Sequence, residues 1–351
     1  MIKLIINRIG SICIWILLLF VFLYTPTFIR WMHRGEKSIT VFTWPLIIDA
    51  NYITEFERET GIKVYISYYE NNEELLTKLK TTRGSGYDLV IPSDYTIEQL
   101  IKEGLVKRID QSKIDFAHRI HPFLKNHYYD PENEYSLPYF WSVYGLGIDL
   151  EAFDGQMPEA TWGLIFEKDK LKTRIGMTDS AREAIMIASQ YLYGSINALE
   201  KPEAQKAVEE LLLKQKPWVE MYSDVRSGDL LASKSCAVVA ALSPDITRLK
   251  KEYPDRDIVF ILPKEGSFML IDAFLIPVLS QKDEWIYQFL NYLYRKEVVQ
   301  HNVERYGFCS PVIDVKGDGD ISVADRKNLE FFRSVIPESM INDIWINLMA
   351  H

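Results

Sequence analysis

From residue 38 onward, short apolar runs rich in β-branched residues alternate with helical patterns. The first run, residues 39–43, ends in Trp44, and a helical segment leads from it to a second run that begins at Ile62. The unit then repeats, and a third run covers residues 87–91. This alternation predicts an α/β fold in which parallel strands are joined by helical crossovers.

Polar and aromatic side chains follow two of these strands. Trp44 ends the first strand, and Ser93 and Tyr95 come soon after the third. In parallel sheets, ligands sit beyond the carboxyl ends of the strands. The three side chains are therefore predicted to share the edge of the sheet that carries a binding site.

Several short segments, all in the same order along the chain, resemble the periplasmic spermidine/putrescine-binding proteins of bacterial ABC importers. They are Glu59-Thr60-Gly61-Ile62-Lys63-Val64, Tyr69-Glu70-Asn71-Asn72-Glu73, Lys78-Leu79-Lys80-Thr81, Tyr87-Asp88-Leu89-Val90-Ile91-Pro92-Ser93, Tyr135-Ser136-Leu137-Pro138-Tyr139-Phe140-Trp141, Ala181-Arg182-Glu183 and Pro263-Lys264-Glu265-Gly266. The resemblance covers residues 38–312 and is vaguer beyond them.

The resemblance implies the type II periplasmic-binding-protein fold, with two α/β lobes and a ligand cleft between them. The chain would cross between the lobes at residues 139–148 and again at 270–277. The expected divisions are a signal or anchor segment with a short linker (1–37), a first lobe (38–142 and 274–312) and a second lobe (143–273 and 313–351).

The same resemblance implies a function. The protein would be the solute-binding component of an ABC importer, which captures a polyamine or related organic cation by lobe closure and delivers it to an inner-membrane permease. We expect a monomer without a cofactor. The alternative is a membrane-tethered receptor or scaffold on the same fold, with altered or lost ligand specificity.

A site for amines needs aromatic walls and at least one acid, because aromatic faces attract ammonium groups and carboxylates pair with them. Trp44 matches the family's ligand-stacking tryptophan, and Ser93 and Tyr95 match other ligand contacts. The alternative is that these three side chains only pack or belong to an ordinary loop. By the same resemblance, Glu183 and Asp272 are the binding acids.

Each acid also has a structural interpretation. Glu183 is near a helix start, where a carboxylate stabilises the helix dipole. Asp272 lies within an apolar run, where an acid is costly unless it is paired. A structural salt bridge to a nearby Lys or Arg is the alternative to ligand binding there.

Other positions depart from the family pattern. Ser180 stands where the family has a second binding aspartate, and Ala240 and Leu270 replace two tryptophans. Ile47 and Phe308 each replace a tyrosine. These changes predict a pocket that is wider, more aliphatic and one charge poorer, so a ligand with two well-separated ammonium groups is harder to accommodate.

The N-terminus predicts an export signal. Lys3 and Arg8 precede an apolar stretch, and positive residues hold that side in the cytoplasm. Residues 11–29 approach the ~20 residues that span a bilayer. No Ala-x-Ala pattern follows, and Cys13 lies too early for a lipoprotein. We expect an uncleaved anchor that tethers periplasmic lobes to the inner membrane, rather than cleavage at an atypical site.

Charge and motifs exclude several other functions. The net charge of −9, without long runs of one sign, argues against nucleic acid. The 6 histidines form no recognisable metal spacing, and no catalytic motif occurs, so we expect no enzyme and no metal site. Residues 314–325 resemble a calcium loop, but Lys316 occupies a ligand position, which favours a surface turn. Cys236 and Cys309 are interpreted as buried free thiols, although they could pair.

Overall fold

The computed structural model describes residues 37–223, 227–317, 319 and 321–350. The predicted membrane segment lies outside the described residues. Within the described part of the chain, no helix is both long enough and apolar enough to cross a membrane.

The N-terminal sheet has the predicted parallel topology. Its strands, in the order β2-β1-β3, are β2 (Lys63–Tyr68), β1 (Ser38–Thr43) and β3 (Leu89–Val90). Helix α2 (Ala50–Thr60) begins after the Asp49 cap and ends at Gly61, whose positive φ of 70° suits a helix C-cap. The third strand is shorter than the predicted run because only two of its residues pair with β1.

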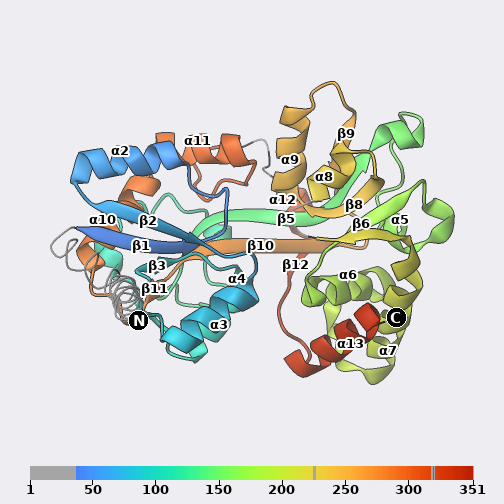
Figure 1. The fold of residues 1–351 in the computed structure, drawn as a ribbon, viewed down its shortest axis with the longest axis horizontal. Helices are drawn as coiled ribbons and strands as arrows, with labels where there is room; N and C mark the ends of the chain where they lie inside the picture. Colours follow the sequence, from blue (N-terminus) through green and yellow to red (C-terminus); the bar gives the residue numbers. More distant parts are fainter. Residues whose placement is uncertain (1–36, 224–226, 318, 320, 351) are drawn as a thin grey trace, which may run out of the picture.

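Two long strands join the two halves of the molecule. β5 (Leu137–Asp149) and β10 (Ser267–Phe274) are antiparallel neighbours, and all their residues are buried. In Figure 1 they run side by side from the left part of the molecule into the right part. We call the left part the first lobe and the right part the second lobe. The two strands overlap the two predicted crossover segments.

Helices and short strands cover both lobes. In the first lobe these are α3 (Asn72–Thr82), α4 (Asp94–Lys102), β4 (Val106–Lys107), β11 (Ile276–Pro277), α10 (Asp283–Leu293) and α11 (Lys296–Tyr306). In the second lobe they are α5 (Gly163–Phe166), β6 (Arg174–Met177), α6 (Ala181–Tyr193), α7 (Pro202–Gln215), β7 (Val219–Tyr222), α8 (Ser227–Ala232), β8 (Cys236–Leu242), α9 (Ser243–Glu252) and β9 (Ile258–Ile261). The larger sheet begins with β12 (Leu329–Phe331) and runs β12-β10-β5-β8-β6-β7, and β9 also pairs with β5.

Each lobe has its own cluster of buried apolar side chains. One cluster takes side chains from β1, α2, α10 and α11, and includes Phe289 and Tyr292. Another takes side chains from β6, α6, α7 and the last helix, α13 (Glu338–Ala350). Along β5 the change from the first cluster to the second falls between Val143 and Tyr144. These two aromatic side chains of α10 therefore belong to the core of the first lobe.

The C-terminal segment crosses from the first lobe to the second. After α11 come α12 (Val323–Arg326) and β12 (Leu329–Phe331), which adds to the larger sheet beside β10. The last helix, α13 (Glu338–Ala350), packs on α6 and α7 (Figure 1). We call residues 329–350 the C-terminal tail.

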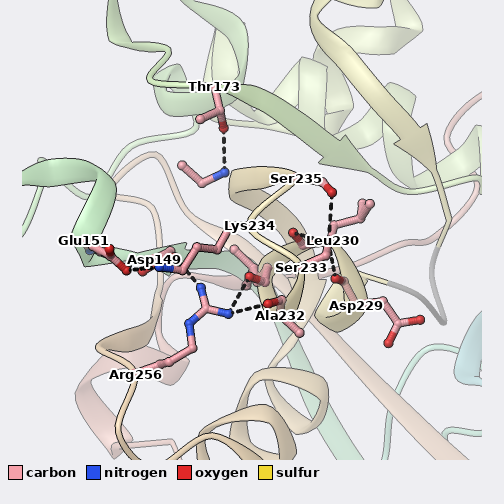
Figure 2. Close-up of polar contacts among 12 residues, drawn as sticks. Asp149, Glu151, Thr173, Asp229, Leu230, Ala232, Ser233, Lys234, Ser235 and Arg256 are labelled. Carbon is pink, nitrogen blue, oxygen red and sulfur yellow. Dashed lines mark hydrogen bonds and ion pairs between the residues drawn. The ribbon is translucent and has the colours of Figure 1, made fainter.

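One arginine fixes the far end of β5 in the second lobe (Figure 2). The Arg256 guanidinium donates to the carbonyls of Leu231 (2.8 Å) and Ala232 (2.7 Å) at the end of α8. It also pairs with Asp149, the last residue of β5. Cations are favoured at helix C-termini because carbonyls there lack intrahelical partners. The contact thus ties α8 to the strand that enters the lobe.

The two described cysteines are free and buried, which confirms their interpretation as thiols. Cys236 lies on β8, whereas Cys309 bridges to Trp141 of β5 through its backbone. They belong to different clusters of the interior.

At Gly145 the backbone of β5 lies so close to β9 that there is no room for a side chain. An added Cβ would lie 2.6 Å from the Ile261 carbonyl oxygen and 2.6 Å from Phe260 Cζ. We expect Gly145→Ala to lower the free energy of unfolding by about 1–3 kcal/mol, measured by urea denaturation. Gly228→Ala is the control, since the nearest atom to its Cβ, on Leu249, is 3.9 Å away. Equal losses in the two variants would contradict this account.

Candidate ligand-binding site

An aspartate on β10 lies at the centre of the predicted site. Asp272 is 8% exposed, and its Oδ1 accepts a 2.8 Å hydrogen bond from the Ser93 hydroxyl. The backbones of the two residues also form an isolated antiparallel bridge. Ser93 occupies the N-cap position of α4, but its side chain does not cap the helix. The fold thus joins two residues that are 179 positions apart in the sequence.

The pairing of β10 with β5 is irregular at this aspartate. The register shifts between Asp272 and Ala273, where the partner residue on β5 changes from Phe140 to Pro138. Such irregularities bend a strand and turn a side chain to a new direction, and they are common beside functional sites. This one coincides with the only acidic residue of β10.

Aromatic side chains that follow β1 and β2 stand beside the Ser93–Asp272 pair. Trp44 is half-buried, and its ring centroid is 4.5 Å from that of Tyr69. The Tyr69 hydroxyl donates to the carbonyl of Ile91 at 2.5 Å, which fixes the ring. The indole N–H of Trp44 is buried without a hydrogen bond of good geometry, yet it is close enough to Asp272 to oppose the rise in its pKa.

Tyr95 reaches the lobe junction from α4. Its hydroxyl accepts a 2.8 Å hydrogen bond from the Asn72 side chain. One face of its ring is covered by the Arg182 guanidinium, whose central carbon is 5.1 Å from the ring centroid. The ring therefore packs against a protein cation of the second lobe.

Glu183 reaches the same junction from the second lobe. It is 5% exposed, lies in the first turn of α6 and accepts a 2.9 Å hydrogen bond from the Thr178 hydroxyl. Ser180 caps the helix by accepting the Glu183 backbone N–H. Burial, and then the charges of Glu73 and Glu183, raise the pKa of Tyr95 well above its ordinary value. The structure therefore brings Glu183 close to Tyr95.

Two buried carboxylates dominate the electrostatics of the site. Burial raises the pKa of Asp272 to about 6, although the hydrogen bond from Ser93 acts in the opposite direction and lowers it. Burial, with the nearby charge of Asp272, raises the pKa of Asp94 to about 7. Among the residues that the structure describes, Asp272 makes no ion pair, so the structural salt bridge considered as its alternative role is not formed there.

Asp94 was not singled out from the sequence. It is fully buried, and its Oδ2 accepts the backbone N–H of Ile271 at 2.9 Å. The available signal was its place between Ser93 and Tyr95 at the start of α4. Asn72 and Arg182 were also not predicted. Each contacts Tyr95, and these contacts between distant parts of the chain form only in the folded protein.

The positions that depart from the family pattern have packing roles. Ala240 and Leu270 belong to the second-lobe core, and Ile47 belongs to that of the first lobe. Phe308 is partly buried and stacks on Phe140, with ring centroids 5.1 Å apart. None of these four side chains offers a polar group to a ligand.

A surface cavity of about 530 Å³ lies elsewhere, between α2, α10 and the segment before β5. Its lining includes Phe56, Arg119 and Arg295, but no residue of the predicted site. Both arginines are already paired, with Asp314 and Glu59 respectively. Carboxylates and aromatic faces meet at the lobe junction instead, so we place the candidate site there.

Within the described residues, no group of three or more His, Cys, Asp or Glu is placed to hold a metal ion. Two positions of the possible calcium loop lie outside the described residues. Asp314 of that loop pairs with Arg119, and Asp325 accepts the Ser322 hydroxyl.

The geometry therefore defines a candidate small-molecule site at the junction of two α/β lobes. Asp272, Ser93, Trp44 and Tyr95 come from the first lobe or the strand that joins the lobes, and Glu183 comes from the second. A buried carboxylate beside aromatic faces is chemically suited to an organic cation. Ligand contact by these five residues stays a prediction.

The chain belongs to the family of bacterial extracellular solute-binding proteins, which it matches over residues 51–327. It is 30% identical over 298 residues to the spermidine/putrescine-binding periplasmic protein of Salmonella typhimurium, covering 85% of this chain and 84% of that protein. It is 28% identical over 280 residues to a putrescine-binding periplasmic protein of Escherichia coli, covering 76% and 75%. The predicted relationship is confirmed.

Solved structures share the fold. A protein from Listeria monocytogenes matches with a TM-score of 0.80 at 25% identity and covers 89% of this chain and 99% of that chain. A spermidine/putrescine ABC transporter substrate-binding protein of Streptococcus pneumoniae matches with a TM-score of 0.76 at 24% identity, covering 90% and 99%. These matches confirm the mixed α/β fold of substrate-binding proteins.

The raised pKa values predict how stability depends on pH. Because burial raises the pKa of Asp272 from 3.8 to about 6 and that of Asp94 from 3.8 to about 7, the ligand-free folded protein binds more protons than the unfolded chain between those values. The contribution of these two groups to stability is therefore most favourable near pH 4 and falls as the pH rises to 7.

We expect Asp272→Asn to reduce this fall by up to about 3 kcal/mol, because a carboxyl that cannot ionise loses nothing as the pH rises. Urea denaturation of ligand-free protein at several pH values measures it. Glu252→Gln, at an exposed acid, is the control. If stability depends on pH in the same way in Asp272→Asn and in the unchanged protein, the pKa of Asp272 is not raised in the folded state.

Proposed function

We propose that this protein is the periplasmic solute-binding component of an ABC importer and that it captures a polyamine or a related organic cation. The buried Asp272 carboxylate carries the proposal, because it has a hydroxyl donor and an aromatic wall but no ion pair among the described residues. A buried charge without a counter-charge is costly, and an ammonium group would supply one. The names of the polyamine-binding relatives support the same ligand class.

Each residue of the site has a different role in binding. Asp272 pairs with one ammonium group, and Ser93 holds the carboxylate in place through its hydroxyl. Trp44 packs on the methylene chain, and Tyr95 presents an edge to the ligand because Arg182 covers one face of its ring. Glu183, from the other lobe, contributes a second acid once the lobes are closed.

Lobe closure would be a hinge motion of the type II binding-protein fold. We assign residues 38–142 and 274–312 to the first lobe and residues 143–273 and 313–351 to the second. The change of core cluster between Val143 and Tyr144 supports the first boundary. The hinge would then lie in β5 and β10, whose few connecting residues absorb the rotation.

The ligand would be short or weakly held at one end. Ser180 caps α6 and gives no charge, while Ala240 and Leu270 are apolar core residues. One ammonium group therefore pairs with the Asp272 carboxylate. A second ammonium group, far from the first, meets no carboxylate at position 180 and is held more weakly. Putrescine, cadaverine and spermidine are the compounds to test.

The partners follow from this role. The ligand passes to an inner-membrane permease that contacts both lobes, and the protein acts as a monomer in the periplasm. Residues 1–37 would tether it to the membrane. Mass spectrometry of the membrane fraction tests the tether: peptides upstream of Ser38 are expected, and a mature protein that begins near Ser38 in the soluble periplasm would contradict it.

Titration calorimetry of folded, ligand-free protein tests the ligand class. We expect measurable binding of putrescine or spermidine and its loss in Asp272→Ala, because breaking a buried ion pair costs about 3–5 kcal/mol. Ser180→Ala, which removes no charge, is expected to change affinity far less. The absence of heat with putrescine, spermidine and cadaverine at millimolar concentrations would rule out the polyamine proposal and leave the fold intact.

A gain of function is also expected. Ser180→Asp restores the acid of the family pattern at a position where aspartate is as good a helix cap as serine. We expect it to strengthen the binding of spermidine at least tenfold more than that of a monoamine such as butylamine, since only the polyamine has another charge to pair. An equal change for both compounds would show that Ser180 does not face the ligand.

A further inference from the structure

An arginine of the second lobe makes a contact across the lobe junction that ligand binding does not explain. Arg182, near the start of α6, is buried, with 4% of its surface exposed. Its guanidinium carbon lies 5.1 Å from the ring centroid of Tyr95 in the first lobe, within the range of a cation–π contact. The Asn72 side chain donates to the Tyr95 hydroxyl at 2.8 Å and so fixes the ring that receives the cation.

The C-terminal tail holds this arginine in place. One terminal nitrogen of Arg182 donates to the Ser334 hydroxyl, and the other donates to Glu338 Oε2 at 2.5 Å. The Arg182 side chain is 5% exposed, whereas that of Glu338 is 47% exposed. The tail therefore supplies, from the surface, the counter-charge of a cation that is buried between the lobes.

The tail itself is attached mainly to the second lobe. Phe332 stacks on Phe268 of the second-lobe core, with ring centroids 4.1 Å apart. Its neighbour Phe331 turns to the first lobe, where its ring lies 4.7 Å from that of His127 and 5.6 Å from that of Tyr128. The tail thus touches both lobes.

We propose that Arg182, held by Ser334 and Glu338, is the residue that sets how readily the two lobes close. Opening the lobes separates Arg182 from Tyr95, but it leaves Arg182 bound to Glu338, because both belong to the second lobe. Because the guanidinium is already held in this orientation, its contact with the Tyr95 ring costs little conformational entropy when the lobes close. Glu338 is a positioning residue, since it acts through Arg182.

The effect on ligand affinity rests on the proposed function, whereas the effect on closure does not. A cation–π contact of ordinary strength changes an equilibrium about 2- to 30-fold. The ratio of closed to open ligand-free protein is expected to fall by a factor in that range when the contact is lost. Ligand affinity, where closure is coupled to binding, falls by at most the same factor, because it follows the closed fraction of the protein.

Distance measurement between the lobes tests the proposal directly. In the full chain with Cys13→Ser, spin labels at Thr81→Cys on α3 and Lys214→Cys on α7 report lobe separation, since both positions are exposed and the remaining thiols are buried. Glu338→Gln is expected to enlarge the population with the longer distance in the absence of ligand.

The control is Asp343→Asn, which removes the same charge from an exposed position of α13 but makes no contact with Arg182. We expect its distances to match those of the unchanged protein. Ser334→Ala is the second test variant and is expected to shift the distances in the same direction as Glu338→Gln. Arg182→Lys, which keeps a cation beside the ring, is expected to shift them less than Arg182→Gln.

The same variants are titrated with putrescine and spermidine. Distances that shift in Glu338→Gln while no variant binds either amine would support the closure inference and contradict the proposed function. Amine binding with identical distances in Glu338→Gln, Asp343→Asn and the unchanged protein would support the function and overturn the closure inference.

Discussion

The hydrogen bond between Ser93 and Asp272 links the first lobe to the strand that both lobes share. On β10, Phe268 and Leu270 belong to the second-lobe core, and Ile271 and Phe274 belong to the core of the first lobe. The carboxylate therefore lies where one strand serves two hydrophobic interiors. A group at that place is shielded from water by both lobes, and this shielding accounts for the raised pKa of Asp272.

An isolated carboxylate in such a position is destabilising. The hydrogen bond from Ser93 offsets part of that cost, but Asp272 makes no ion pair with any residue that the structure describes. Arg182, by contrast, pairs with Glu338 and packs on the Tyr95 ring, and it forms no ion pair with Asp272 among the residues that the structure describes.

Much of the architecture followed from the sequence. The parallel pairing of β1 with β2 and β3 agrees with the predicted segments, and β5 and β10 overlap the two predicted crossovers. Long periodic patterns of this kind specify buried faces directly. The structure brings Ser93, which follows β3, against Asp272 of β10, and ligand contact there stays a prediction.

The sequence alone determined the α/β class and the family, because apolar periodicity and short motifs are local properties of the chain. It did not specify the contacts that Asp94, Arg182 and the C-terminal tail make. These contacts join residues far apart in the chain, such as Arg182 with Glu338, 156 positions away. Only the tertiary structure decided them, since burial and the pairing of charges are set by how separate segments pack together.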